Sequence, residues 1–200
     1  MNSPTKRKEM MNRLLKELVV KTVLAMIQEG TSITMDNVAA RCGVSKGTLY
    51  NYFKNKKDLL NYIHETVIIP IKKGSNKIFE KNIPPMEKIY GFVGNVFNFQ
   101  KEYPLYFKFI QSQRSAAEAV TERMDVIILP LVNVCREGMR LGQFVDVDPY
   151  VMAAMIFGTV VGPLESMTYR ETELRDLEKL KQEIVRFLDK CILKEQERSL

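Results

Sequence analysis

The stretch that most constrains this chain runs from Ile33 to Leu60 and reads ITMDNVAARCGVSKGTLYNYFKNKKDLL. It predicts two short helices joined by a tight turn, followed by the start of a longer helix. Thr34 and Ser45 are the expected N-caps, because their hydroxyls can accept from the free N–H groups of a first turn. Gly43 stands where the first short helix must end, since glycine enters the left-handed conformation without steric cost. This pattern is typical of a helix-turn-helix, which places its second helix in the major groove of DNA.

The second short helix divides its side chains between a core side and an outward side. Leu49 and Phe53 share one face and are expected to pack on the first short helix. Asn55 is the expected cap of the longer helix, with Asp58 at the capping-box position. The outward positions and nearby lysines offer hydroxyl and amide donors to bases and cations to phosphates. The predicted DNA contacts are Thr34, Ser45, Lys46, Gly47, Thr48, Tyr50, Asn51, Tyr52, Lys54 and Lys56.

This run, above all VSKGTLYNYFKNKKDLL, resembles the DNA-binding signature of the TetR family of bacterial transcriptional regulators. The resemblance is dense over Leu14 to Leu60. It is looser at REGMRLGQFVDVDP, which is similar to the join between the seventh and eighth helices of that family. The resemblance implies an all-helical homodimer that binds a palindromic operator in double-stranded DNA. It also implies a C-terminal domain that dimerises and binds a small-molecule effector.

The excess positive charge is confined to the helix-turn-helix end of the chain. Residues 1–60 contain eleven Lys or Arg and five Asp or Glu, a net charge of +6, whereas the remainder contains 19 of each sign. A solubilising surface would more naturally spread its charge over the whole chain. The asymmetry therefore indicates a polyanionic partner at one end of the molecule.

Other sequence features narrow the class of protein. Three cysteines without a CxxC pair indicate neither a disulfide framework nor a zinc site, and reduced thiols fit the cytoplasm. The N-terminus lacks the apolar region of a signal peptide, and the longest uncharged run, Pro149 to Leu164, is short for a membrane span. HExxH and a phosphate-binding glycine loop are absent, and there is one histidine, so we expect no enzyme and no cofactor.

Helical periodicity dominates the chain and predicts an all-α fold of about nine helices. We expect a DNA-binding domain over residues 1–58 and an effector-binding and dimerisation domain over residues 59–200. Pro70 should kink or break the helix that starts near Lys56. In the first domain we expect a loose arm over residues 1–8 and an apolar helix face through Leu14, Leu18 and Met26. In the second domain we expect a helix from Ala116 to Leu141 with Pro130 inside it. The last helix should run from Glu173 to Lys194, with Phe187 and Cys191 facing inward.

Two features of the second domain bear on function. Gly158 and Gly162 lie four residues apart on an apolar helix and allow a second helix to come close. Packing within the chain explains them equally well, and the family resemblance favours a dimer. The predicted interface is Gly158, Gly162, Leu177, Ile184 and Leu188.

The second feature is a concentration of aromatic and methionine residues, which suits a pocket for apolar or aromatic ligands. An ordinary core is the competing interpretation for each of them, and for His64 a surface or interdomain position is the favoured interpretation. The predicted ligand contacts are His64, Phe92, Asn95, Phe97, Phe99, Tyr103, Phe107, Gln111 and Met155. The sequence thus predicts a ligand-responsive DNA-binding regulator, most simply a repressor. The alternative is a helical protein-interaction module without sequence-specific DNA binding, which would leave the basic helix-turn-helix unused.

Overall fold

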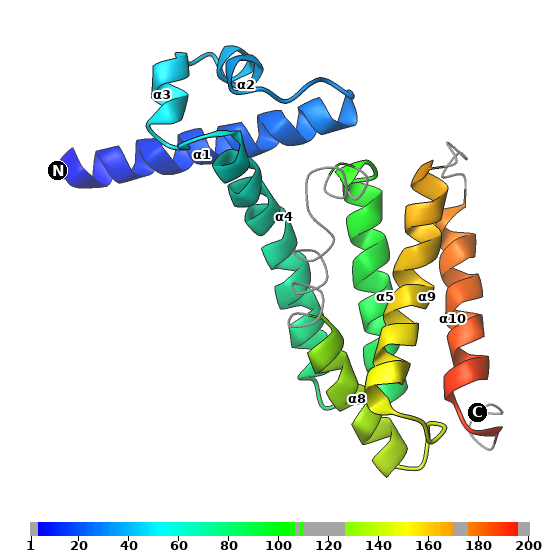
Figure 1. The fold of residues 1–200 in the computed structure, drawn as a ribbon. Coiled ribbons are helices and arrows are strands. Elements are labelled where there is room, and N and C mark those ends of the chain that lie inside the picture. Colours follow the sequence, from blue (N-terminus) through cyan, green and yellow to red (C-terminus); the bar gives the residue numbers. More distant parts are fainter. Residues whose placement is uncertain (1–3, 107–108, 110–126, 170–175, 196–200) are drawn as a thin grey trace. The chain divides into compact units, whose positions relative to one another are not determined.

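The computed structural model describes residues 4–106, 109, 127–169 and 176–195. These residues form eight helices and no strand, which confirms the all-α class (Figure 1). The helices are α1 (Pro4–Gln28), α2 (Met35–Arg41), α3 (Lys46–Tyr50), α4 (Lys56–Phe79), α5 (Pro85–Glu102), α8 (Leu129–Arg140), α9 (Pro149–Tyr169) and α10 (Leu177–Ile192).

The chain divides into two compact units, Met1–Ile69 and Pro70–Leu200, with the division inside α4. Helix α4 is continuous from Lys56 to Phe79 with Pro70 inside it, so of the two expected effects, a kink or a break, the break does not occur. Proline removes one backbone hydrogen bond, because it has no N–H to donate. The turns on either side keep their own bonds, and the helix persists across the junction.

The first unit contains the predicted helix-turn-helix, which packs on the long helix α1. Val19, Val23 and Met26 are the buried side of α1, whereas Leu14 and Leu18 are exposed rather than part of that side. The helix begins at Pro4, so residues 4–8 are helical and not the loose arm expected from their charge. Charged residues are good helix formers, which explains why composition alone misjudged this segment.

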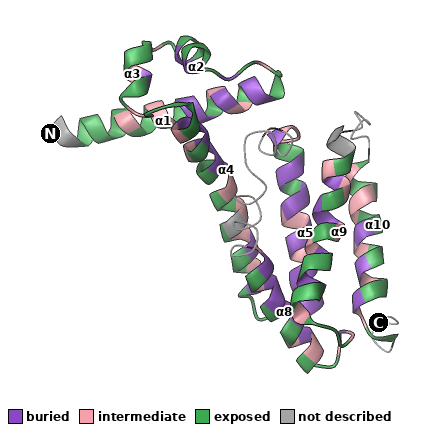
Figure 2. Cartoon of the chain, in the orientation of Figure 1, coloured by how far each residue is buried: buried purple, intermediate pink, exposed green. Residues whose placement is uncertain are grey.

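The second unit packs α5, α8, α9 and α10 around one hydrophobic core, shown by the buried stripes in Figure 2. Phe92 and Val93 of α5 meet Leu131 of α8 and Val160 of α9 in this core. The Tyr90 hydroxyl of α5 donates to Asp189 Oδ1 of α10 at 2.6 Å. This hydrogen bond and the burial of the phenol raise the pKa of Tyr90, so the hydroxyl remains a donor at neutral pH.

The structure gives two of the predicted helix boundaries. Helix α8 begins at Leu129 with Pro130 in its first turn, and Ile127 and Ile128 before it are π-helical. Residues 110–126, and with them most of the predicted helix from Ala116, lie outside the described part of the chain. Helix α10 begins at Leu177, where the Asp176 carboxylate caps it by accepting from Lys179 N–H at 2.9 Å.

The inward face of α10 also differs from the prediction. Ile184, Leu188 and Ile192 are buried, and their spacing of four residues defines the core side. Phe187 is 54% exposed and Cys191 is also exposed, so their predicted inward orientation is wrong. Each lies one position before a core residue, about 100° away around the helix.

A close contact fixes the end of α8. Gly142, with φ +74°, closes the helix as predicted, and the chain folds back so that Phe144 is completely buried. A Cβ placed on Gly138 would collide with the Phe144 ring. Gly94 on α5 has no such neighbour, since a Cβ there would meet nothing within 4 Å. The two glycines therefore make a matched pair of helical positions.

We predict opposite effects of the same substitution at these positions. Gly138→Ala should lower the free energy of unfolding by about 1–3 kcal/mol through overpacking against Phe144. Gly94→Ala should raise it by about 0.5–1 kcal/mol, because alanine favours the helix. Urea unfolding followed by circular dichroism measures both. Equal effects of the two substitutions would contradict the close packing of Phe144 on α8.

Candidate nucleic-acid interface

Side-chain caps hold the two short helices on either side of the turn. The Thr34 hydroxyl accepts from Asn37 N–H at 3.1 Å, and Ser45 Oγ accepts from Thr48 N–H at 3.0 Å. Gly43 has φ +66°, a conformation that strains other residues. The predicted caps and turn are thereby confirmed, and the hydroxyls of Thr34 and Ser45 are engaged in holding the backbone.

Burial of two side chains fixes which way α3 faces. Leu49 is completely buried and Phe53 is 2% exposed, as predicted, and the Phe53 ring lies 5.5 Å from that of Tyr62 on α4. The opposite side carries Tyr50, which is 44% exposed, together with exposed Gly47. Asn51 is also exposed, as the C-cap of α3. Thr48 is half-buried, and its Oγ1 lies 2.8 Å from Ser45 Oγ.

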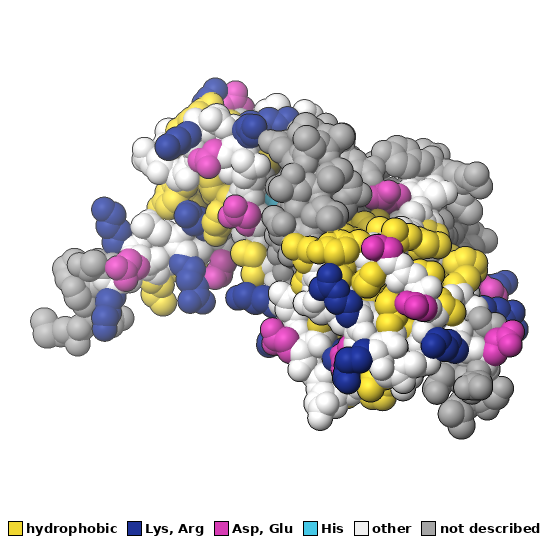
Figure 3. Space-filling view, turned by 60° about the horizontal axis from the view of Figure 1, so that its bottom comes forward, with side chains coloured by type: hydrophobic (Ala, Val, Ile, Leu, Met, Phe, Trp, Pro, Cys, Tyr) yellow, Lys and Arg dark blue, Asp and Glu magenta, His cyan; other side chains and the backbone are white. Residues whose placement is uncertain are grey.

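Lysines flank this outward side at both ends. Lys46 Nζ lies 2.6 Å from Asp36 Oδ1 on α2, and hydrogen bonding to that carboxylate raises the pKa of the ammonium. Lys54 and Lys56 are exposed at the start of α4. Several basic side chains are visible on the first unit in the space-filling view (Figure 3). An ammonium has three donors, so Lys46 can meet a phosphate while it keeps its contact to Asp36.

The start of α4 is capped somewhat differently from the prediction. Asn55 Oδ1 accepts from Asp58 N–H at 2.9 Å, which confirms Asn55 as the cap. The Asp58 carboxylate, however, accepts from Lys54 N–H at 2.9 Å rather than from Asn55. The reciprocal bond thus reaches one residue further back and orders the backbone at Lys54. This order fixes the direction in which the lysine side chain leaves the chain.

Tyr52 has a structural partner that the sequence did not reveal. Its hydroxyl donates to Asn12 Oδ1 of α1 at 2.6 Å. Lys16 of α1 lies 4.8 Å from the centre of the Tyr62 ring, a cation–π contact between α1 and α4. Asn12 and Lys16 escaped the sequence analysis because their partners are 40 or more residues away. Both contacts stabilise the frame that presents α3.

The comparisons with known proteins agree with this geometry. The family model described as "Bacterial regulatory proteins, tetR family" matches residues 22–63, which include both short helices and the start of α4. The chain is a TetR-family transcriptional regulator. It is 27% identical over 146 residues to the HTH-type transcriptional regulator YhgD of Bacillus subtilis, across 70% of this chain and 75% of YhgD.

Solved structures show the same fold over most of the chain. SmeT in its triclosan complex has a TM-score of 0.74 with 21% identity, covering 91% of the regulator and 93% of SmeT. SmeT is the repressor of the Stenotrophomonas maltophilia multidrug efflux pump SmeDEF. FadR of Bacillus subtilis, in complex with stearoyl-CoA, has a TM-score of 0.72 with 22% identity, covering 86% of the regulator and 96% of FadR.

The predicted ligand contacts that the structure describes lie in several different environments. Phe92 and Phe97 belong to the core of the second unit. Phe99 and Tyr103 do come together, with ring centres 5.3 Å apart. Met155 is 65% exposed on α9 and does not join them. Two further predicted contacts, Phe107 and Gln111, lie outside the described residues.

Two polar residues among the predicted contacts have defined environments. Asn95 Nδ2 donates to the Ile71 carbonyl at 3.0 Å and to Ser75 Oγ at 2.9 Å, so this amide joins α5 to α4. His64 is 4% exposed, which excludes the surface position considered for it. Burial and a hydrogen bond to Glu102 raise the pKa of Tyr103 to about 12, so its hydroxyl stays protonated at neutral pH.

A buried amide that no sequence signal marked follows Phe99 in the chain. Gln100 is completely buried, and its Nε2 donates to the Pro104 carbonyl at 3.2 Å. Its Oε1 has no hydrogen-bond partner among the residues that the structure describes. A buried acceptor without a donor is unfavourable by about 1–3 kcal/mol. Polar residues in apolar helices carry no distinctive spacing, so no sequence signal marked this one.

The predicted dimer contacts divide into two groups. Gly158 and Gly162 are exposed on α9, where a Cβ would meet nothing within 4 Å. Ile184 and Leu188 are buried in the core of their own chain, and Leu177 is packed against that core. Only the two glycines are therefore available to a partner without repacking of the second unit.

Two further features are absent from the described residues. No group of three or more His, Cys, Asp or Glu side chains there is placed to hold a metal ion. Among the helices of the described part, none is long and apolar enough to cross a membrane.

We predict that Tyr50 and Leu49, neighbours on α3, have separate roles. Tyr50→Ala should change the preference among operator sequences by about 1–3 kcal/mol and leave the melting temperature nearly unchanged. Leu49→Ala should destabilise the first unit by about 2–5 kcal/mol through a cavity. Fluorescence anisotropy with operator variants and thermal unfolding separate the two effects. Similar losses of melting temperature would show that the helix faces another way.

Proposed function

We propose that the regulator is a homodimeric repressor that a small apolar or aromatic effector releases from a palindromic operator. In this proposal residues 1–58 bind DNA, and residues 59–200 dimerise and bind the effector. A bacterial repressor of this kind acts in the cytoplasm, where the chromosome lies. The observation that carries the proposal is the outward side of α3: Tyr50, Asn51 and Gly47 are exposed between lysines and take no part in the core. That arrangement suits a helix whose side chains contact the edges of bases in DNA.

An exposed apolar stripe on α9 supports the homodimer. Val151, Met155, Gly158 and Gly162 are all exposed and recur at intervals of three or four residues, which places them on one side of the helix. Phe187 adds an exposed aromatic ring on α10. The small residues permit close approach of a second helix, and the larger ones supply apolar area for burial. This surface replaces the predicted contacts at Ile184 and Leu188.

The effector proposal rests on the aromatic pair and on two structural neighbours. SmeT binds triclosan and FadR binds stearoyl-CoA, and both ligands have large apolar parts. Phe99 and Tyr103 offer two adjacent rings, and Gln100, which follows Phe99 in the chain, has a buried side-chain oxygen without a hydrogen-bond partner among the described residues. That oxygen favours an effector which carries a hydroxyl or N–H donor on an otherwise apolar body, because the donor satisfies the buried acceptor.

We predict a steep salt dependence of DNA binding. The logarithm of the association constant should fall linearly with the logarithm of the salt concentration, because lysines displace counterions from phosphates. Lys56→Ala should weaken binding to all duplexes alike and reduce the slope by about one unit if it meets one phosphate. Anisotropy titrations between low and physiological salt measure the slope. Affinity that does not depend on salt would refute a phosphate-binding surface here.

We also predict that operator and effector weaken each other's binding by the same factor. An effector releases DNA only through its differential affinity for the DNA-competent state and the other state. Thermodynamic linkage makes this coupling reciprocal. Calorimetric titration of triclosan as the probe, with and without a saturating operator duplex, should give a larger dissociation constant with DNA. Two identical constants would rule out this probe as a releasing effector.

The Gln100→Leu variant should bind triclosan more weakly if the Gln100 oxygen accepts a hydrogen bond from the phenol.

A further inference from the structure

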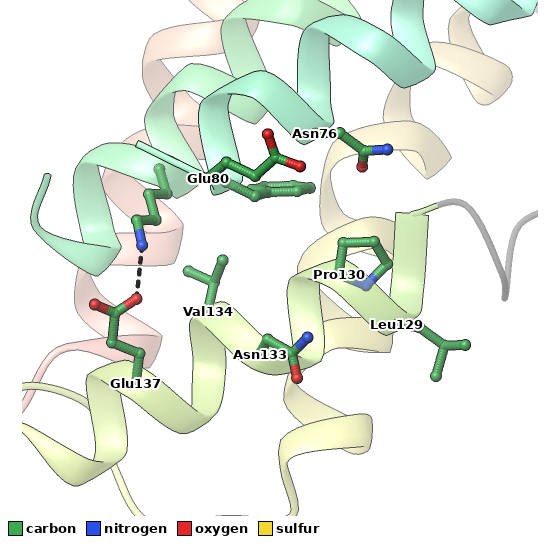
Figure 4. A pocket seen from close by; sticks show the side chains of 9 residues that line it. Asn76, Glu80, Leu129, Pro130, Asn133, Val134 and Glu137 are labelled. Atoms are coloured by element: carbon green, nitrogen blue, oxygen red, sulfur yellow. Dashed lines mark hydrogen bonds and ion pairs between the residues drawn. The ribbon is translucent and has the colours of Figure 1, made fainter. Parts of the chain in front are cut away.

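A surface pocket lies in the second unit between the end of α4 and one face of α8 (Figure 4). Its volume is about 410 Å³, within the usual size of small-molecule sites. The floor is formed by the buried side chains of Phe79, Lys88 and Val134, and the exposed Asn76, Glu80 and Asn133 stand at the rim. Among the predicted ligand contacts that the structure describes, none lines this pocket.

The positive charge on the floor is already neutralised. Lys88 Nζ of α5 donates to Glu137 Oε2 of α8 at 2.7 Å, and the lysine side chain is 8% exposed. Separation of this part-buried pair would leave the ammonium of Lys88 without a compensating charge, which is unfavourable. Lys88 is therefore not available to attract an anionic ligand. Its pairing also ties α5 to α8 and keeps the pocket walls in place.

The carboxylate at the rim, by contrast, is not neutralised. Glu80 has no ion-pair partner in the described part of the chain. Asn133 Oδ1 accepts from Arg136 Nη1 at 3.4 Å, so its amide group is already turned toward a cation outside the pocket lining. Asn76 beside Glu80 has no such contact and can accept a hydrogen bond. The lining as a whole carries one excess negative charge, located at Glu80.

We propose that this pocket binds small organic amines. The protonated nitrogen lies at Glu80 and Asn76, and an apolar ring packs against Phe79, Val134 and the rim proline Pro130. A charged hydrogen bond to Glu80 supplies the preference for a cation, and the buried floor supplies apolar contact. The proposal goes beyond operator release by an effector at Phe99 and Tyr103, because it concerns a different site and requires no DNA.

Three probes with one ring system test the charge preference. Equilibrium dialysis of the full-length protein at pH 7 compares 1-naphthylmethylamine, 1-naphthalenemethanol and 1-naphthoate, which are cationic, neutral and anionic. We expect the amine to bind at least about fivefold more tightly than either of the others, the increment of one well-placed charge contact. Equal or tighter binding of the alcohol or the carboxylate would overturn the proposal.

Matched variants locate the binding. Glu80→Gln should reduce amine affinity about fivefold and leave the alcohol unaffected. Glu87→Gln removes the same charge from an exposed position on α5 outside the pocket and should change neither. Asn133→Trp at the exposed rim should block all three probes by filling the pocket. Identical behaviour of the two glutamine variants, or amine binding that survives Asn133→Trp, would place the amine elsewhere. Operator affinity measured separately distinguishes failure of this proposal from failure of the repressor proposal.

Discussion

The DNA-binding surface depends on the burial of Leu49 and Phe53. A helix of five residues is too short to hold its orientation by its own hydrogen bonds. These two side chains fix the rotation of α3 against its neighbours, and the outward direction of Tyr50 and Asn51 follows from that rotation. The Ser45 cap and the left-handed Gly43 then set where the helix begins. Tyr50 and Asn51 can contact bases because the apolar core behind α3, which touches no DNA, fixes the orientation of this helix.

Much of the first unit could be predicted because its signals are local. Caps, the turn glycine and the apolar spacing all fall within residues 33–60, and each has a direct physical meaning at short range. The contacts that escaped prediction join distant segments: Tyr52 with Asn12, and Lys16 with Tyr62. No periodicity records such pairs. The continuity of α4 across Pro70 was equally hidden, since the loss of one hydrogen bond is outweighed by the rest of a long helix.

The second unit was predicted less well because its apolar residues exceed what one core needs. Ile184 and Phe187 are both suitable core residues, and only the packing of α10 on α5 and α9 decides that Phe187 remains exposed. The same surplus made buried Phe92 and exposed Met155 equal candidates for a ligand site. Conversely, Glu80 and Gln100 looked ordinary in the sequence. They became candidates only when the structure showed a pocket beside one and no partner for the other.

The contact between Lys46 and Asp36 has a consequence for the search along the chromosome. A phosphate that Lys46 contacts also lies near the Asp36 carboxylate, which is 2.6 Å from Lys46 Nζ and repels the phosphate. This repulsion weakens attraction to any duplex, whatever its sequence. A genome offers about 10⁶–10⁹ competing sites, so weaker attraction to all of them leaves more protein free to reach the operator, where base contacts add to the phosphate contacts. Asp36 therefore favours discrimination between the operator and other DNA, and it lowers the affinity for DNA as a whole. Repulsive groups serve specificity in the same way in other interfaces.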